Sequence, residues 1–346
     1  MKHQTTRYGE IPFYKIGTFG NTADAFISKK LFLEYRTKYS FPKKGDILIS
    51  ASGTIGRAVI YDGKPAYFQD SNIVWIDNDE TLVKNDFLFY AYSNVKWNTE
   101  HTTILRLYND NFRNTLIPLP PLNEQNAIAN ILSALDRYLY ALDALILKKE
   151  GVKKALSFEL LSQRKRLKGF NQAWQRVRLG DIANYLTSNL SVEQITQQGK
   201  IKVYDVNNFI GYTDTTFISD KPYISIVKDG SVGRVRILPP KTNILSTMGA
   251  LIANHRTTTE FLFYLLSNLD FKNFTNGSII PHIYFKDYKE KTIFLPPLNE
   301  QIAIANILSA LDNEIASLKN KKRQFENIKK TLNHDLMSAK IRVLKK

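Results

Sequence analysis

Few side chains in this sequence have the types and spacings that support catalytic chemistry. The five histidines are His3, His101, His255, His282 and His334, and no pair of them has the spacing of metal ligands. The Gly-x-Ser-x-Gly elbow and the kinase motifs are absent. An amino-methyltransferase would need an Asn/Asp-Pro-Pro-aromatic motif, whereas every Pro-Pro pair here follows a leucine. We therefore predict no catalytic residue and no metal site.

Two glycine motifs could be phosphate-binding loops: Gly53-x-x-Gly56-Arg57 and Gly230-x-x-Gly233-Arg234. Neither has the Gly-Lys-Ser/Thr ending of a P-loop or the Gly-x-Gly-x-x-Gly spacing of a dinucleotide fold. Tight turns between strands, with glycine at positive φ, explain them better. Their arginines then either contact a DNA backbone or are simply solvated.

Basic and aromatic residues alternate outside the helical parts of the chain, and the formal net charge is +16. This balance favours a polyanionic partner, since Lys and Arg bind phosphates while Arg and His can also contact base edges. The alternative is a solvated basic surface that keeps a coiled coil in solution. The candidate DNA-binding residues are Lys29, Lys30, Arg36, Lys43, Arg57, Arg106, Arg113, Lys221, Lys228, Arg234, Arg236, Arg256, His282 and Lys286.

These candidates lie on either side of a stretch that occurs twice. Residues 119–136 recur at residues 295–312, and the two copies differ only where Asn126 is replaced by Ile302. The copies are 176 residues apart in a chain of 346, which indicates a duplicated domain. Each copy predicts a helix start: a Pro-Pro pair imposes an extended approach, and Asn123 and Asn299 are predicted N-caps.

After each helix start, apolar residues recur at alternating spacings of four and three, which predicts a narrow coiled-coil seam. Lys322 and Lys329 occupy two seam positions at which the pattern would place an apolar residue. The second helix, from Asn299 to about Ser338, would be roughly 60 Å long. The predicted seam residues are Ile128, Leu132, Leu135, Leu139, Leu142, Ile146, Ile304, Leu308, Leu311, Ile315, Leu318, Phe325, Leu332 and Leu336.

The globular parts look β-rich. Residues 47–50, 58–61 and 72–76 are short apolar runs bounded by turn residues, which predicts strands, and residues 87–92 favour a short helix. The predicted order is globular, helix, globular, helix. Its segments are a first domain over 1–121, a first spacer helix over 122–172, a second domain over 173–297 and a second spacer helix over 298–346.

Two unlike globular parts, each followed by Leu-Pro-Pro-Leu-Asn-Glu-Gln, and the opening Trp174…Leu179-Gly-Asp-Ile182 resemble the specificity (S) subunit of type I restriction-modification systems. The resemblance covers essentially the whole chain. It implies an α+β fold in which two target recognition domains alternate with helices that pair as an antiparallel coiled coil. Each domain would read one half of a split DNA sequence, and the helices would fix the gap between the halves.

The resemblance also implies the partners. The helix starts would dock methylation (M) subunits, and restriction (R) subunits would complete the assembly on double-stranded DNA. S-adenosylmethionine, ATP and Mg²⁺ belong to those subunits, so this chain is expected to be non-catalytic and to hold no cofactor. The implied docking residues are Pro121, Asn123, Glu124, Gln125, Pro297, Asn299, Glu300 and Gln301.

The first unit departs from the family pattern. Family members have the Trp…Leu-Gly-Asp-Ile opening in both units, whereas the first unit here starts at about Gly9 without it. The missing piece corresponds in length to about two secondary-structure elements. We expect a shortened or recombined form whose first recognition domain is N-terminally incomplete, and is either impaired or completed by another chain.

Other functions remain open at this stage. The chain could be a coiled-coil scaffold without specific DNA readout, the detached specificity half of a fused restriction-methyltransferase, or a single-strand binder with aromatic platforms. No apolar run, signal peptide or lipidation motif suggests a membrane. Cysteine is absent, which fits a reducing cytoplasm.

Overall fold

The computed structural model describes residues 4–68, 72–97, 106–277 and 279–344. The chain divides into two compact units, one formed by Met1–Asp143 with Asn320–Lys346 and the other by Ala144–Lys319. Each unit therefore contains a β-rich part together with one half of each long helix.

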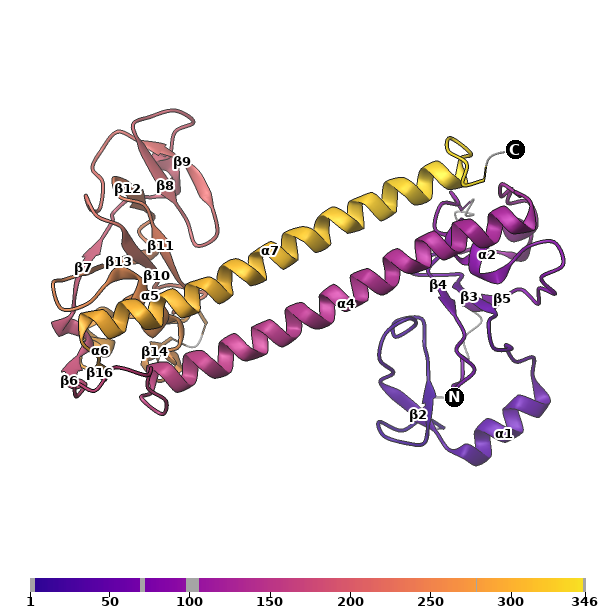
Figure 1. Ribbon diagram of the computed structural model, residues 1–346, viewed down its shortest axis with the longest axis horizontal. Coiled ribbons are helices and arrows are strands. Elements are labelled where there is room, and N and C mark those ends of the chain that lie inside the picture. Colours follow the sequence, from indigo (N-terminus) through magenta and orange to yellow (C-terminus); the bar gives the residue numbers. More distant parts are fainter. Residues whose placement is uncertain (1–3, 69–71, 98–105, 278, 345–346) are drawn as a thin grey trace. The chain divides into compact units, whose positions relative to one another are not determined.

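The first unit contains small antiparallel sheets and short helices (Figure 1). β1 pairs with β2, and β3 lies between β4 and β5. Its elements are β1 (Ile11–Phe13), β2 (Ala25–Ile27), α1 (Lys29–Lys38), β3 (Ile47–Ser50), β4 (Ala58–Ile60), β5 (Ile73–Trp75), α2 (Asn85–Tyr92), α3 (Asn109–Arg113) and the first half of α4 (Leu122–Leu161). The strands predicted at 47–50, 58–61 and 72–76 and the helix predicted at 87–92 are thus confirmed.

The second unit has a larger sheet with the strand order β11-β10-β13-β7, a second sheet β12-β8-β9, and the pairs β14-β15 and β16-β6. Its strands are β6 (Gln175–Arg178), β7 (Ala183–Thr187), β8 (Ile201–Tyr204), β9 (Phe209–Thr213), β10 (Tyr223–Val227), β11 (Val235–Leu238), β12 (Thr242–Ile244), β13 (Met248–Ala253), β14 (Thr275–Asn276), β15 (His282–Ile283) and β16 (Thr292–Leu295). Its helices are α5 (Thr259–Ser267), α6 (Phe285–Tyr288) and the first half of α7 (Leu298–Met337), with 3₁₀ turns at Leu179–Asp181, Val192–Gln194 and Lys272–Phe274.

The long helices begin at Leu122 and Leu298, so Asn123 and Asn299 lie inside them and their assignment as N-caps was wrong. Pro121 already has its carbonyl oxygen in the first turn, where it accepts the N–H groups of Glu124 and Gln125, both at 2.9 Å. Asn123 lies inside this turn, and its Oδ1 accepts the N–H of Glu124 at 2.9 Å. Asn299 makes the same contact with Glu300.

The two long helices pair antiparallel, as predicted, because ion pairs join rising residue numbers on one helix to falling numbers on the other. In the first unit Asp136 pairs with Lys329 and Asp143 with Lys322. In the second unit Lys149 pairs with Glu314 at 2.7 Å, and Arg166 lies further along and pairs with Glu300.

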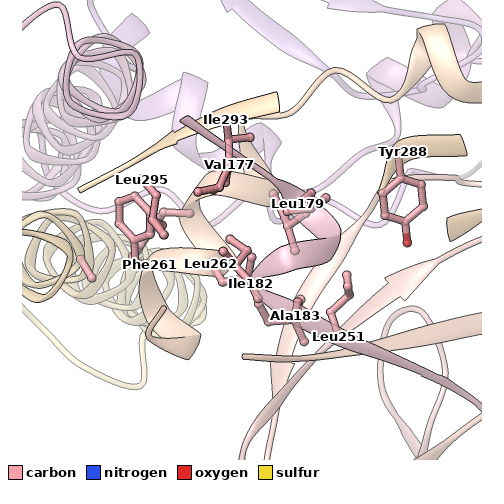
Figure 2. Packing of buried hydrophobic residues seen from close by; sticks show 14 of the residues in the cluster. Val177, Leu179, Ile182, Ala183, Leu251, Phe261, Leu262, Tyr288, Ile293 and Leu295 are labelled. Carbon is pink, nitrogen blue, oxygen red and sulfur yellow. The ribbon is translucent and has the colours of Figure 1, made fainter. Parts of the chain in front are cut away.

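All of the predicted seam residues are buried or half-buried. Within each unit the seam also packs on a short helix of the β-rich part. In the first unit Ile128, Leu132 and Leu336 form one cluster with Phe87 and Tyr90 of α2. In the second unit Leu160, Ile304 and Leu308 belong to the corresponding cluster. This cluster is larger, since it also includes residues of the β-rich part such as Leu179, Ile182 and Leu251 (Figure 2). None of the described helices is long and apolar enough to cross a membrane.

Candidate nucleic-acid interface

Both glycine motifs form tight turns between paired strands, as predicted. The first turn connects β3 with β4, and the second connects β10 with β11. Gly53 and Gly56 have φ values of 65° and 82°, and Gly230 and Gly233 have 81° and 80°. An L residue would be strained at such angles, so glycine is required for this turn geometry.

The arginine at the end of each turn contacts a hairpin loop of a neighbouring sheet. Arg57 donates through Nη1 to the carbonyl oxygen of Phe19 at 3.0 Å, in the loop between β1 and β2. Arg234 donates through Nη2 to Oδ1 of Asn207 at 3.0 Å, in the loop between β8 and β9. Both arginines remain exposed. Each therefore holds a turn and a loop together while its charge stays accessible to an anion.

A second basic residue lies beside each turn. In the first unit Arg106 forms an isolated antiparallel β-bridge with Ser52, and in the second unit His282 forms one with Asp229. Nδ1 of His282 lies 2.6 Å from Oδ1 of Asp229. The structure thus brings Arg57 close to the segment of Arg106, and Arg234 close to that of His282. The sequence did not reveal that Arg106 and His282 occupy equivalent positions.

The remaining DNA-binding candidates are more scattered. Lys29, Lys30 and Arg36 lie on α1, and Lys221 precedes β10. Arg236 is close to the second turn, with its guanidinium 5.0 Å from the ring centre of Tyr204. Lys43 forms an ion pair with Asp77, and Arg113 forms one with Asp110. Arg256 donates a hydrogen bond to Gln175, and the ammonium group of Lys286 lies over the ring of Tyr284. Lys228 lies on the β10–β11 turn.

No group of three or more His, Cys, Asp or Glu side chains within residues 4–68, 72–97, 106–277 and 279–344 is arranged to hold a metal ion. His3 and His101 lie outside the described residues.

The glutamate of each helix start is buried and bound by an arginine that lies five residues beyond the end of the other long helix. Glu300 accepts from Arg166 at 2.6 Å and from the indole Nε1 of Trp174 at 2.9 Å. Glu124 accepts from Nε of Arg342 at 2.8 Å. Hydrogen bonding to Arg342 holds the pKa of the Glu124 carboxyl below its usual value. These pairs therefore fasten the two helices together at their ends.

The glutamine of each helix start is also buried, and it binds the segment that precedes the short helix of its unit. Gln301 accepts from the N–H of Thr258 at 3.1 Å and donates to the carbonyl of Arg256 at 2.9 Å. Gln125 accepts from the N–H of Lys84 at 2.8 Å and donates to the carbonyl of Leu82 at 3.1 Å. The Glu-Gln dipeptide thus attaches each spacer helix to its own β-rich part.

A tyrosine, an aspartate and a lysine form a third repeated contact. In the second unit the hydroxyl of Tyr264 donates to Asp312 at 2.9 Å, and Asp312 pairs with Lys153 at 2.5 Å. In the first unit Tyr90 donates to Asp136 at 2.7 Å, and Asp136 pairs with Lys329. Burial, together with the hydrogen bond to aspartate, raises the pKa of both tyrosine hydroxyls.

Sequence reasoning missed the arginine and lysine partners in these clusters. The signal for the arginines was present, because Leu-x-Ser-x-x-x-Arg occurs at residues 160–166 and again at 336–342, with the same 176-residue offset. The seam also continues through Leu156 and Leu160, which pack in the second core. Lys149 and Lys153 interrupt the apolar pattern there and hid this continuation.

Only some of the proposed docking residues reach the surface. Glu124, Gln125, Glu300 and Gln301 are buried within their own units. Pro121, Asn123 and Asn299 are exposed, and Pro297 is half-buried. A docking subunit could therefore touch only these last four.

Comparison with known proteins follows the same division of the chain. Residues 1–149 and 171–327 both match the family described as the type I restriction modification DNA specificity domain. A Haemophilus influenzae protein named as a type I restriction enzyme specificity subunit is 64% identical over 133 residues, which span 38% of this chain and 34% of that relative. A Methanocaldococcus jannaschii protein named as the MjaX specificity subunit is 28% identical over 337 residues, spanning 86% of this chain and 79% of the relative.

Among solved structures, the S subunit of a type I restriction-modification system from M. genitalium matches with a TM-score of 0.64. The match covers 97% of this chain and 91% of that one at 22% identity. At this level of identity the similarity establishes a shared fold.

Proposed function

The chain belongs to the family of type I restriction modification DNA specificity domains, and we propose that it is the DNA sequence-recognition subunit of such a system. Each unit reads one half of a two-part target in double-stranded DNA, and the paired helices set the spacing between the halves. The observation that carries this proposal is the duplication itself: the same buried clusters hold two β-rich parts whose turns and loops differ.

The glycine turns are the best supported reading elements. Each turn carries one exposed arginine, and a backbone bridge joins the turn to the segment of a second basic residue. Arg57 and Arg234 suit phosphate contacts, whereas Arg106 and His282 differ between the units and suit contacts to bases. A difference in chemistry at equivalent positions is what two unlike half-sites require.

Catalysis is assigned to partner subunits. We propose that the chain holds no cofactor and is not an enzyme, and that methylation subunits using S-adenosylmethionine dock at the exposed residues of the helix starts. Restriction subunits would supply the chemistry that needs ATP and Mg²⁺. The assembly would act in the cytoplasm, where the host DNA lies.

The test is selection from a pool of random DNA duplexes by the full chain at several salt concentrations. A specificity subunit should enrich two short sequences separated by a fixed gap, with affinity falling steeply as salt rises. A scaffold would enrich nothing, and a single-strand binder would prefer unpaired strands. Either of those outcomes would overturn the proposal.

A matched variant tests the role of the helices. Inserting seven residues after Ala144 and seven after Asn320 keeps the seam in phase on both helices and lengthens them by about 10 Å. The gap between the enriched sequences should grow by about three base pairs at about 3.4 Å each, while the two sequences stay the same. An unchanged gap would contradict the spacing role.

A further inference from the structure

The opening segment of the second unit, residues 174–187, is built into its core. Trp174 donates to the buried carboxylate of Glu300. β6 pairs with β16, with Val177 opposite Ile293, and Leu179 and Ile182 are fully buried (Figure 2). The segment then continues as β7, which pairs with β13.

The first unit has counterparts of the strands that this segment pairs with. Among the residues that the structure describes, no segment of this kind pairs with them. Residues 116–119 correspond to β16 through the internal repeat, but they form no strand. Leu119 is 48% exposed, whereas its counterpart Leu295 is 4% exposed. Within the described part of the chain, β5, which takes the place of β13 beside the central strand, pairs only with β3, whereas β13 pairs with both β10 and β7.

A cavity of about 270 Å³ lies at the end of this uncovered edge. It is lined by Pro121, Glu124, Ile128, Leu336 and Arg342, among others. By the internal repeat, Glu124, Ile128 and Leu336 correspond to Glu300, Ile304 and Leu160.

In the second unit Glu300 accepts the indole N–H of Trp174, and Leu160 and Ile304 belong to the core cluster that includes Trp174. Arg342 is 49% exposed where its counterpart Arg166 is 26% exposed. The cavity thus corresponds to the site that the indole occupies in the second unit.

The backbone of residues 116–119 is compatible with a new strand. In the second unit the N–H of Leu179 donates to the carbonyl of Lys291, so the hydrogen-bonding positions of this antiparallel ladder continue at Ile293 and Leu295. Phe294 lies between them at a non-hydrogen-bonded position. Its counterpart is Pro118, where the missing N–H costs no ladder bond.

We propose that the edge at Ile117–Leu119, the cavity beside Glu124 and the edge of β5 opposite to β3 together form a docking surface for an extended segment of another polypeptide. The segment carries a tryptophan followed by apolar residues at the third, fifth and eighth positions after it, as in Trp174, Val177, Leu179 and Ile182. It adds strands to both edges of the first unit, with the indole in the cavity. This docking does not depend on the DNA-reading role.

The experiment uses a fluorescent peptide with the sequence of residues 172–188, titrated into the full chain and followed by anisotropy. Saturable binding at one site is expected, and a Trp174→Ala peptide should bind about tenfold more weakly or worse, since it leaves the apolar cavity unfilled. In the protein, Leu119→Glu should weaken binding by a similar factor. Leu116→Glu is the matched control and should change affinity less than about twofold, because its counterpart Thr292 stays exposed beside β6.

Hydrogen exchange locates the peptide. The amides of Ile117 and Leu119 should gain protection on binding. Three results would each overturn the proposal: no saturable binding, equal affinity for the Leu119→Glu variant, or new protection confined to residues 292–295, where the peptide would only have replaced β6.

Discussion

Gln301 offers the sharpest test of how a spacer helix is held to its β-rich part. Its side chain is fully buried and makes four hydrogen bonds. Oε1 accepts from Oγ1 of Thr257 at 2.9 Å and from the N–H of Thr258 at 3.1 Å, and Nε2 donates to the carbonyls of Arg256 at 2.9 Å and Pro296 at 2.8 Å. Gln301→Leu keeps a similar volume but removes all four hydrogen bonds.

The expected loss follows from these four groups. A lost hydrogen bond that leaves a buried group unsatisfied costs about 1 kcal/mol or more, so Gln301→Leu should lower the free energy of unfolding of the second unit by about 4 kcal/mol. Gln125 makes one bond fewer, to Lys84, Leu82 and Pro120, and Gln125→Leu should cost the first unit about 3 kcal/mol. The control Gln324→Leu, at an exposed position of α7, should change the free energy by less than about 0.5 kcal/mol.

Native-state hydrogen exchange is the suitable assay, because a chain with two compact units need not unfold in one two-state transition. The slowest amides of β10 and β13 report the second unit, and those of β3 report the first. A loss of about 4 kcal/mol corresponds to an increase of about a thousandfold in their exchange rate. An increase of less than about fivefold, or one equal to that of Gln324→Leu, would refute the role assigned to this side chain.

Three further outcomes are expected. Asp312→Ala should destabilise the second unit by about 1 kcal/mol in chemical denaturation, since it removes a tyrosine hydrogen bond and a partly exposed ion pair; an unchanged midpoint would contradict this. Because Arg342 lowers the folded-state pKa of Glu124, the stability that this carboxylate contributes should be complete above its ordinary pKa of about 4.5 and be lost as pH falls through the lower folded-state value. Thermal melts of Glu124→Gln should therefore lie below wild type at pH 7 and converge with it in acid, and a constant difference at all pH values would exclude the mechanism. His282→Ala should alter the letters selected in one half-site and leave the other half-site and the gap unchanged, as read by duplex selection.

The sequence predicts best those features that depend on neighbours along the chain. The strands at residues 47–50 and 58–60 are unbroken apolar runs closed by turn residues, and the long helices follow from a heptad pattern. The N-caps were misplaced because the carbonyl of Pro121 takes up the first free N–H groups, which is a matter of three-dimensional geometry. The short pair β14–β15 has no apolar pattern of its own and depends on surrounding contacts.

The clusters themselves depend on partners far apart in the sequence. Glu124 and Arg342 form one ion pair, yet their positions suggest a relation only after the two copies of the chain are aligned out to their ends. Lys153 interrupts the apolar series of the seam, and a lysine at such a position normally weakens a coiled coil. Its ammonium group reaches Asp312, so at this position an ion pair joins the two helices in place of apolar packing.

The exchange of partners between copies explains why this aspartate and this lysine are the same in both copies while the β-rich parts have diverged. Asp136 of the first copy binds Lys329 of the second, and Asp312 of the second copy binds Lys153 of the first. A substitution in either helix therefore needs a matching change in the other copy. The reading elements bind only within their own part, as Arg234 does with Asn207, and can change alone. Exchanging the charges of Asp136 and Lys329 together should accordingly restore stability that either single change removes, whereas changes at the reading turns need no such compensation.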